Sequence, residues 1–130
     1  MAVEKLQELK QAEKTEVASY FNGMGFDRWN RIYSDSDDVN KVQRNIRIGH
    51  QKTVDDVLSW LKESGVIEQT SFCDAGCGVG SLSLPLAALG ACSITASDIS
   101  ESMVLETQRR ALAAGLDMNK FTFITSDLES

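Results

Sequence analysis

A glycine-rich turn between two apolar segments constrains the fold of this chain more than any other feature. Residues 72–80 read Phe-Cys-Asp-Ala-Gly-Cys-Gly-Val-Gly. Glycine at every second position removes the Cβ atoms that would keep a ligand away from the backbone. A β-favouring run at 70–73 precedes the turn, and leucines at helical spacing follow it over 81–89. This strand, turn and helix predict an α/β fold with a nucleotide-type ligand at the turn.

The spacing and charge of the turn distinguish two cofactor classes. A dinucleotide fingerprint would have its third glycine at position 81, which is Ser81, and would hold a pyrophosphate at a helix N-terminus. Asp74 precedes the first glycine, where its charge would repel a pyrophosphate but attract an ammonium and a sulfonium. We therefore expect S-adenosylmethionine (SAM) rather than NAD. The contacts expected at the turn come from Asp74, Gly76, Gly78 and the backbone of Cys77.

A second predicted strand, residues 93–97, leads to an acidic residue that suits a ribose. Asp98 lies about twenty residues beyond the turn, where a carboxylate can accept hydrogen bonds from both ribose hydroxyls. Ile99 and Met103 follow at positions from which apolar side chains could sandwich an adenine ring. We expect all three residues to contact the cofactor.

A third strand is predicted at 121–125, after a helix over about 101–114 that Gly115 ends. Asp127 and Leu128 follow this strand, and an acidic side chain there could accept a hydrogen bond from the adenine amino group. Ligands bind outside the carboxyl ends of the strands in open α/β sheets. Three successive strand ends are therefore expected to form one binding edge.

Each feature also has a purely structural explanation. The glycine-rich segment could be only a tight turn. Ser100 is a good N-cap residue with Glu101 in the first turn, so the segment after Asp98 could simply begin a helix. Asp127 alone could be a surface-loop residue. The order and spacing of the three strand ends together favour cofactor binding over these alternatives.

Composition excludes several other functions. The chain has 130 residues, room for one small domain, and its 13 basic against 19 acidic residues argue against a nucleic-acid partner. It has no run of about eighteen apolar residues, so no transmembrane segment is expected. A zinc site would need more ligands than the cysteines supply, so no metal site is expected. We expect reduced, small buried thiols at Cys73, Cys77 and Cys92.

The first half of the chain is predicted to form a helical arm or lid, residues 1–65. An amphipathic helix over 1–21 and a longer helix over 39–63, ended by Gly65, flank a connector at 22–33 that is rich in aromatics and arginine. A glycine-bearing loop of this composition suggests a lid over a flat apolar ligand.

Two sets of side chains in this half have open roles. Phe26, Trp29 and Tyr33 could cover the ligand, or could only attach the helices to the core. The long helix carries a basic stretch that could bind carboxylates of the cofactor or substrate, or could be a solvated face. Its members are Lys41, Arg44, Arg47, His50 and Lys52.

A doubly wound methyltransferase sheet usually has about six or seven strands. Only three are visible, so residues 66–130 are expected to form the first half of a Rossmann-like SAM-binding core. Such a half-sheet would leave an open edge and an exposed apolar face.

Short motifs along the chain carry a resemblance to a known family. They are Tyr20-Phe21-Asn22, Gly25-Phe26-Asp27-Arg28-Trp29, Arg31-Ile32-Tyr33, Val42-Gln43, Ile46-Arg47, Gly49-His50, Thr53-Val54, residues 73–83, residues 96–100 and residues 127–130. From about Tyr20 onward the chain closely resembles the magnesium protoporphyrin IX O-methyltransferases of chlorophyll biosynthesis. The glycine turn is generic to class I methyltransferases, whereas the two segments between Gly25 and Tyr33 are far more specific.

The resemblance implies SAM-dependent methylation of the ring propionate of magnesium protoporphyrin IX, giving the monomethyl ester. It implies a role for Tyr33 at the active site. Phe26 and Trp29 of the aromatic connector and Arg47 of the basic stretch are expected on the substrate side. The family works in the chloroplast stroma, with thylakoid or envelope association, or in the cyanobacterial cytoplasm, in loose contact with membranes and magnesium chelatase. Its sheet continues past the position of Ser130 with a histidine-containing segment implicated in catalysis, for which His50 is no substitute.

Two other functions remain open from the sequence. One is a class I methyltransferase that acts on another small acid or metabolite. The other is a non-catalytic fragment that binds SAM weakly or serves only as a partner.

Overall fold

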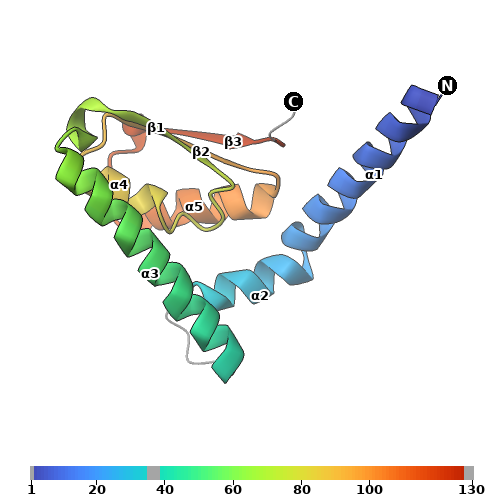
Figure 1. The fold of residues 1–130 in the computed structure, drawn as a ribbon, viewed down its shortest axis with the longest axis horizontal. Helices are drawn as coiled ribbons and strands as arrows, with labels where there is room; N and C mark the ends of the chain where they lie inside the picture. The colour runs from blue at the N-terminus through green and yellow to red at the C-terminus, as the bar shows by residue number, and fades with distance from the viewer. Residues whose placement is uncertain (1, 35–38, 128–130) are drawn as a thin grey trace.

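The computed structural model describes residues 2–34 and 39–127. Three helices come first, and an alternation of strands and helices follows (Figure 1). The elements are α1 (Ala2–Asn22), α2 (Met24–Ile32), α3 (Lys41–Ser64), the 3₁₀ turn η1 (Ile67–Gln69), β1 (Ser71–Ala75), α4 (Ser83–Ala88), β2 (Ser93–Asp98), α5 (Glu101–Ala113), the 3₁₀ turn η2 (Met118–Lys120) and β3 (Phe121–Thr125).

The three strands form one parallel sheet in the order β1-β2-β3. Cys73 pairs with Thr95, and Thr95 pairs with Thr122, so the strands run in close register. Two β-α-β crossovers, through α4 and α5, connect the strands, as parallel pairing requires. Each strand begins and ends within two residues of its predicted bounds, and all three carboxyl ends meet at one edge.

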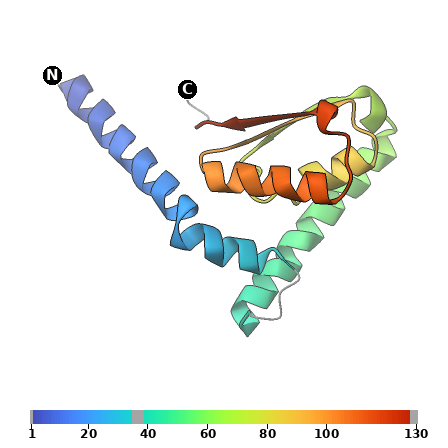
Figure 2. The same cartoon turned by 180° about the vertical axis from the view of Figure 1, so that it is seen from behind.

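The core lies on one face of this sheet. Helices α4 and α5 cover that face, and α3 crosses its end, as both views show (Figures 1 and 2). Alternate strand residues such as Phe72, Ile94 and Phe121 point into this layer, because side chains along a strand alternate between faces. The buried cluster consists of Val54, Leu58, Ile67, Leu86, Ala91 and Ile94.

The opposite face of the sheet carries no helix within the described part of the chain (Figure 2). Cys73 and Thr122 on that face are exposed, and Ile124 is 41% exposed. An exposed sheet face was expected from the small number of strands. Burial of Cys73 and Cys92 was also predicted and is wrong, because Cys73 points to this uncovered face and Cys92 lies exposed just before β2.

Helix boundaries follow the predicted stop and start residues closely. Helix α3 begins with a capping box, in which Asn40 accepts from the Gln43 amide and Gln43 accepts from the Asn40 amide. It ends at Gly65, whose φ of 70° is left-handed. Ser100 caps α5 by accepting from the Met103 amide, so the structural explanation considered for Ser100 is correct.

The predicted loop at 22–33 is wrong, because most of it is helix α2. Gly25 was included in a glycine-bearing loop, but it is buried in α2, and a Cβ there would lie 2.4 Å from the Tyr20 ring. The absence of a side chain at Gly25 therefore allows α1 and α2 to pack closely, and it does not mark a flexible loop.

Helix α1 forms an arm opposite the carboxyl edge of the sheet, outside the core (Figures 1 and 2). It was predicted to be an amphipathic helix, and the helix is confirmed, but no residue of it is buried. Val3 is 67% exposed and Leu6 is 54% exposed. None of the helices in the described residues is long and apolar enough to cross a membrane.

Candidate functional site

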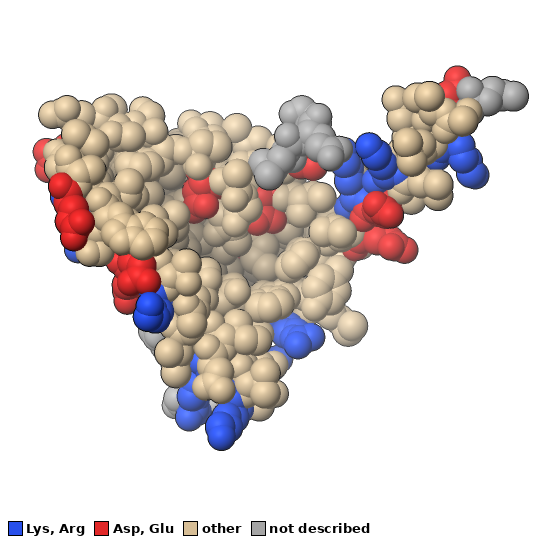
Figure 3. Space-filling view, viewed as in Figure 1, with Lys and Arg blue, Asp and Glu red and all other residues tan. Residues whose placement is uncertain are grey.

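One cavity of about 520 Å³ opens at the carboxyl edge of the sheet, beneath α1 and α2. A volume of this size is typical of small-molecule sites. It is lined by Lys14, Phe21, Trp29, Tyr33, Gly76, Gly78, Asp98, Ile99, Met103, Ser126 and Asp127. The molecule is hollowed between α1 and the sheet, and mostly uncharged side chains surround the hollow (Figure 3). All three predicted strand ends therefore contribute to a single cavity.

The glycine turn leaves β1 and folds back onto the end of β2. The amides of Gly76 and Cys77 both donate to the carbonyl oxygen of Ser97, each at 2.8 Å. Gly76 and Gly78 have φ of 76° and 55°, and a Cβ at either would meet no atom within 4 Å. The turn thus presents bare backbone to an open space, which is the arrangement that a closely approaching ligand requires.

Gly80 has a different task from the other two glycines of the turn. Its φ is 88°, and a Cβ would lie 2.8 Å from Cγ2 of Thr107 in α5. Thr107 in turn donates from Oγ1 to the Gly78 carbonyl oxygen at 2.7 Å. Gly80 therefore allows the turn to pack tightly on α5, which fixes the position of the cavity wall.

Asp98 organises the turn as well as lining the cavity. Its Oδ2 accepts from the Gly78 amide at 3.0 Å, and its Oδ1 accepts from the Ser100 amide at 2.9 Å. A carboxylate offers about four acceptor positions, so further hydrogen bonds remain available toward a ligand. The same residue can therefore shape the turn and accept from hydroxyl groups in the cavity.

Ile99 and Met103 provide the apolar part of the wall on the α5 side. Met103 is 4% exposed. The start of α5 is held to the arm, since Asn22 accepts from Ser100 Oγ at 2.7 Å and from the Ser102 amide at 3.0 Å. The place predicted for the adenine ring is thus next to an apolar surface, and hydrogen bonds to Asn22 hold the backbone that carries it.

The end of β3 closes the third side. Ser126 donates from its amide to the Asp98 carbonyl oxygen at 2.9 Å, which extends the sheet contact beyond β3. Asp127 pairs with Lys14 of α1 at 3.5 Å, with about a quarter of each side chain exposed. Leu128, predicted as a further contact, lies outside the described residues.

Aromatic residues from α1 and α2 form the wall opposite the strands. Trp29 and Tyr33 line the cavity with ring centroids 5.6 Å apart, and Tyr33 stacks on His50 of α3 at 4.2 Å. Burial raises the pKa of Tyr33 above its ordinary value, so its phenol is a hydrogen-bond donor at neutral pH. Burial also lowers the pKa of His50, whose buried Nε2 has no hydrogen-bond partner among the described residues.

Four predicted site residues do not line the cavity. Asp74 accepts from Ser83 Oγ at 2.6 Å, and Cys77 packs its thiol 3.8 Å from Thr107 Oγ1. Arg47 donates from Nε to the Ile32 carbonyl oxygen at 2.6 Å and from Nη2 to the Arg31 carbonyl oxygen at 2.9 Å, so it binds the C-terminal end of α2. Phe26 is half-buried in α2.

Three lining residues were not predicted, namely Lys14, Phe21 and Ser126. Lys14 and Phe21 enter because α1 lies over the strand ends, which no local pattern reveals. Ser126 directly precedes Asp127, and the strand-end argument could have included it.

The thiols provide a direct check of the local structure. Cys77 is 7% exposed and burial raises its pKa to about 12, whereas Cys73 and Cys92 are exposed. We expect an aromatic disulfide reagent at pH 8 to modify Cys73 and Cys92 quickly and Cys77 slowly, because the thiolate is the reactive form. Mass spectrometry of peptides at timed quenches measures this, with the denatured chain as control. Equal rates at all three thiols would contradict the described burial.

Comparison with known proteins bears on both fold and site. Residues 72–130 match the family model of a methyltransferase domain. The magnesium-protoporphyrin O-methyltransferase of Synechocystis is 54% identical over 116 residues, which cover 89% of this chain and 50% of that protein. The chloroplastic magnesium protoporphyrin IX methyltransferase of Arabidopsis thaliana is 45% identical over 124 residues, which cover 95% of this chain and 39% of that protein.

Solved structures agree with these relatives. The crystal structure of the Synechocystis magnesium protoporphyrin IX methyltransferase with bound SAM superposes with a TM-score of 0.83 at 55% identity, over 88% of this chain and 54% of that one. The structure of the same protein with bound S-adenosylhomocysteine gives a TM-score of 0.82, over 88% of this chain and 52% of that one. The chain thus spans about half the length of the Synechocystis protein, and less of the Arabidopsis one.

The comparisons confirm the resemblance predicted from the sequence. Together with the three parallel strands they also confirm the predicted fold class, the N-terminal part of a Rossmann-like methyltransferase sheet preceded by helices.

Proposed function

We propose that this chain binds SAM at the carboxyl edge of its sheet and serves the O-methylation of the ring propionate of magnesium protoporphyrin IX. The observation that carries the proposal is the single cavity of about 520 Å³ to which all three strand ends contribute. The named relatives and the bound SAM in the Synechocystis structure support it. Residues 66–130 would form the first half of the cofactor-binding core, and residues 1–65 an arm on the substrate side.

The residues of the cavity fit SAM by shape and by chemistry. The bare backbone of Gly76 and Gly78 leaves room for close approach, and Asp98 has acceptor positions for ribose hydroxyls. Ile99 and Met103 offer an apolar surface for the adenine ring, and Asp127 an acceptor for its amino group. When bound, SAM would supply an electrophilic methyl group on a sulfonium.

The remaining task of the protein is placement. A propionate has a pKa near 4 to 5, so at neutral pH it is already a nucleophile and needs no general base. Attack on a sulfonium neutralises two charges, which a less polar and water-poor environment favours. Trp29 and Tyr33 would exclude water and cover a flat ring, and the protonated Tyr33 hydroxyl would donate a hydrogen bond that orients the carboxylate.

Tyr33→Phe tests this role. We expect slower methyl transfer, by about 10- to 100-fold for the loss of one orienting hydrogen bond, and a SAM dissociation constant within about twofold of the original. The aromatic stack on His50 is preserved in this variant, so the fold should not change. Steady-state rates and calorimetry measure the two quantities. An equal loss of rate and affinity would remove Tyr33 from the proposed role.

Methyl transfer from labelled SAM tests the whole proposal. Magnesium protoporphyrin IX is compared with metal-free protoporphyrin and with small carboxylic acids as acceptors. Label in the porphyrin monomethyl ester supports the proposal. Preferential transfer to another acid would instead indicate a different class I methyltransferase, and SAM binding without transfer to any acceptor would indicate a cofactor-binding module only.

The setting of the activity follows from the same proposal. One relative is chloroplastic and the other is cyanobacterial. We place this chain correspondingly in the chloroplast stroma near thylakoid or envelope membranes, or in the cyanobacterial cytoplasm. Contact with magnesium chelatase is part of the proposal and rests on the family resemblance.

A further inference from the structure

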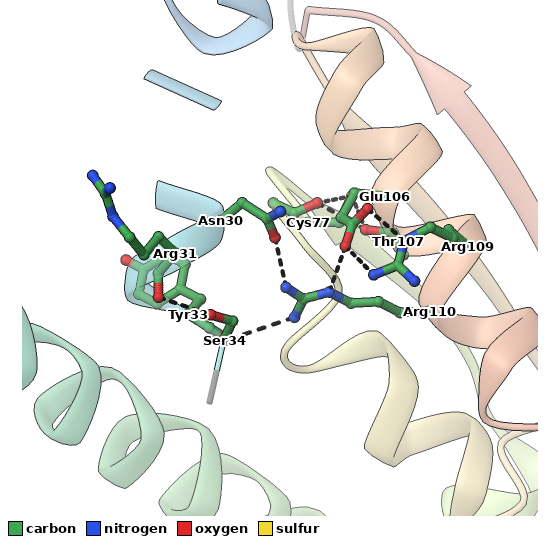
Figure 4. Close-up of polar contacts among 10 residues, drawn as sticks. Asn30, Arg31, Tyr33, Ser34, Cys77, Glu106, Thr107, Arg109 and Arg110 are labelled. Atoms are coloured by element: carbon green, nitrogen blue, oxygen red, sulfur yellow. Dashed lines mark hydrogen bonds and ion pairs between the residues drawn. The ribbon is translucent and has the colours of Figure 1, made fainter. Parts of the chain in front are cut away.

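The aromatic wall of the cavity is held from outside by a polar cluster between α2 and α5. Arg110 of α5 donates from Nη2 to Oδ1 of Asn30 at 2.6 Å. Its Nη1 also reaches the carbonyl oxygen of Tyr33, at the longer distance of 3.5 Å. Figure 4 shows the guanidinium between the end of α2 and the side of α5. One side chain therefore contacts both the last turn of α2 and Tyr33, the residue that follows the helix.

The guanidinium is itself fixed on the α5 side. Arg110 Nε donates to Oε1 of Glu106 at 3.0 Å, one helical turn earlier. Glu106 is 8% exposed and is also bound by Arg109 in a bidentate pair at 2.6 and 2.8 Å. The hydrogen bonds from Arg109 lower the pKa of Glu106, with Arg110 adding to the effect, so the carboxylate is ionised at neutral pH. Such charge-assisted pairs are among the stronger hydrogen bonds in proteins.

The contacts lie next to the residues that matter for the cavity. Asn30 follows Trp29 directly, and the accepting carbonyl belongs to Tyr33 itself. The side chains of Trp29 and Tyr33 line the cavity, whereas Asn30 and Arg110 do not. Arg110 has 22% of its side chain exposed, and Arg109 has 66%, so only the former is embedded between the two helices.

We propose that Arg110 is a positioning residue, which holds the C-terminal end of α2 so that Trp29 and Tyr33 stay against the cavity. It touches neither the cofactor region nor the cavity and acts only through α2. The importance of this position for catalysis rests on the proposed function, but the anchoring of α2 does not. The two are therefore measured separately.

The anchoring is tested by hydrogen exchange of the α2 amides in the chain without added ligand. Arg110→Met keeps much of the apolar stem and removes the guanidinium. We expect amide exchange in residues 26–33 to accelerate by about tenfold. The variant loses the hydrogen bonds from Arg110 that hold α2 against α5, so local opening of α2 becomes less costly. Arg109→Met is the matched control, since it removes a neighbouring guanidinium from the same Glu106, and in the described part of the chain the hydrogen bonds of Arg109 go to Glu106 rather than to α2.

A spectroscopic readout follows Trp29 directly. The chain has two tryptophans, and Trp60 is 66% exposed, so Trp60→Phe leaves Trp29 as a single reporter. In this background Arg110→Met should increase acrylamide quenching of Trp29, and Arg109→Met should not. Asn30→Ala should reproduce the effect of Arg110→Met, while Asn30→Asp, which keeps the acceptor, should retain slow exchange.

The outcomes separate the two proposals. Unchanged α2 exchange in Arg110→Met, or equal acceleration in Arg109→Met, would overturn the positioning role whatever the chain binds. If Arg110→Met also speeds exchange throughout the strands, the substitution has destabilised the whole fold, and the milder Asn30→Ala is used instead. Slow α2 exchange in Asn30→Ala would then overturn the positioning role. A failure of the original chain to bind SAM would count against the proposed function and leave the result for α2 intact.

Discussion

Asp98→Ala is expected to weaken SAM binding by about 1 to 3 kcal/mol, or roughly 5- to 150-fold. The carboxylate holds the amides of Gly78 and Ser100 and is the acceptor that we assign to the ribose. Its removal would therefore leave two backbone donors and the ligand hydroxyls without their partner. Calorimetric titration with SAM measures the loss, and circular dichroism checks that the sheet remains.

Two controls make the result specific. Asp117→Ala removes another carboxylate, one that accepts from the Asn119 amide at the start of η2, away from the cavity. It should leave SAM affinity unchanged. Asp98→Asn keeps one acceptor oxygen and loses the charge, so an intermediate affinity is expected. Full affinity in Asp98→Ala would remove Asp98 from the site.

Gly80→Ala is expected to cause a large loss of stability, because this glycine combines a positive φ with close contact to α5. The backbone there has a φ of 88°, and the new Cβ would lie 2.8 Å from Thr107 Cγ2 and 3.2 Å from Leu84 Cγ. Positive φ and overpacking together should lower the free energy of unfolding by about 2 to 4 kcal/mol. Thermal and urea unfolding followed by circular dichroism measure it.

Gly49→Ala is the matched control, because Gly49 lies within α3 and a Cβ there meets nothing within 4 Å. Alanine in a helix interior is favoured over glycine by about 0.5 to 1 kcal/mol, so this variant should be slightly more stable than the original. The two substitutions thus have opposite signs. A loss of stability in both, or in neither, would contradict the described packing of the turn on α5.

The strands and the turn were predictable because local chemistry determines them. Alternating glycines behind β1, the acid that ends β2 and the short apolar run of β3 each appear within a few residues of sequence. Their convergence follows from parallel pairing, which places successive carboxyl ends at one edge. This is why six of the nine cofactor residues predicted from the sequence, all but Asp74, Cys77 and Leu128, line the cavity.

The wall of the cavity formed by α1 and α2 was harder to predict, because it depends on contacts between segments that are far apart in the sequence. Gly25 looked like a loop residue, but it lies in α2, where only a glycine leaves room for the Tyr20 ring. Lys14 reaches Asp127 only because α1 lies over the strand ends. Arg47 looked available for a ligand carboxylate, but it is used by the carbonyl oxygens at the end of α2. None of these pairings has a local signature in the sequence.

The exposure of the cysteines has the same origin. A small apolar thiol in a strand is usually buried when both faces of the sheet are covered. Here Cys73 points to the face that carries no helix in residues 2–34 and 39–127, while Cys77 turns inward toward Thr107. The uncovered face of the sheet, rather than the residue type, therefore determines the exposure of Cys73.

Equilibrium binding to the unmodified chain tests the central claim most directly. SAM and NAD are titrated separately into the protein by calorimetry, with circular dichroism of the same sample to establish that it is folded. We expect saturable binding of SAM at one site and no heat of binding with NAD. A folded chain that binds NAD, or that shows no saturable binding of SAM, would contradict it.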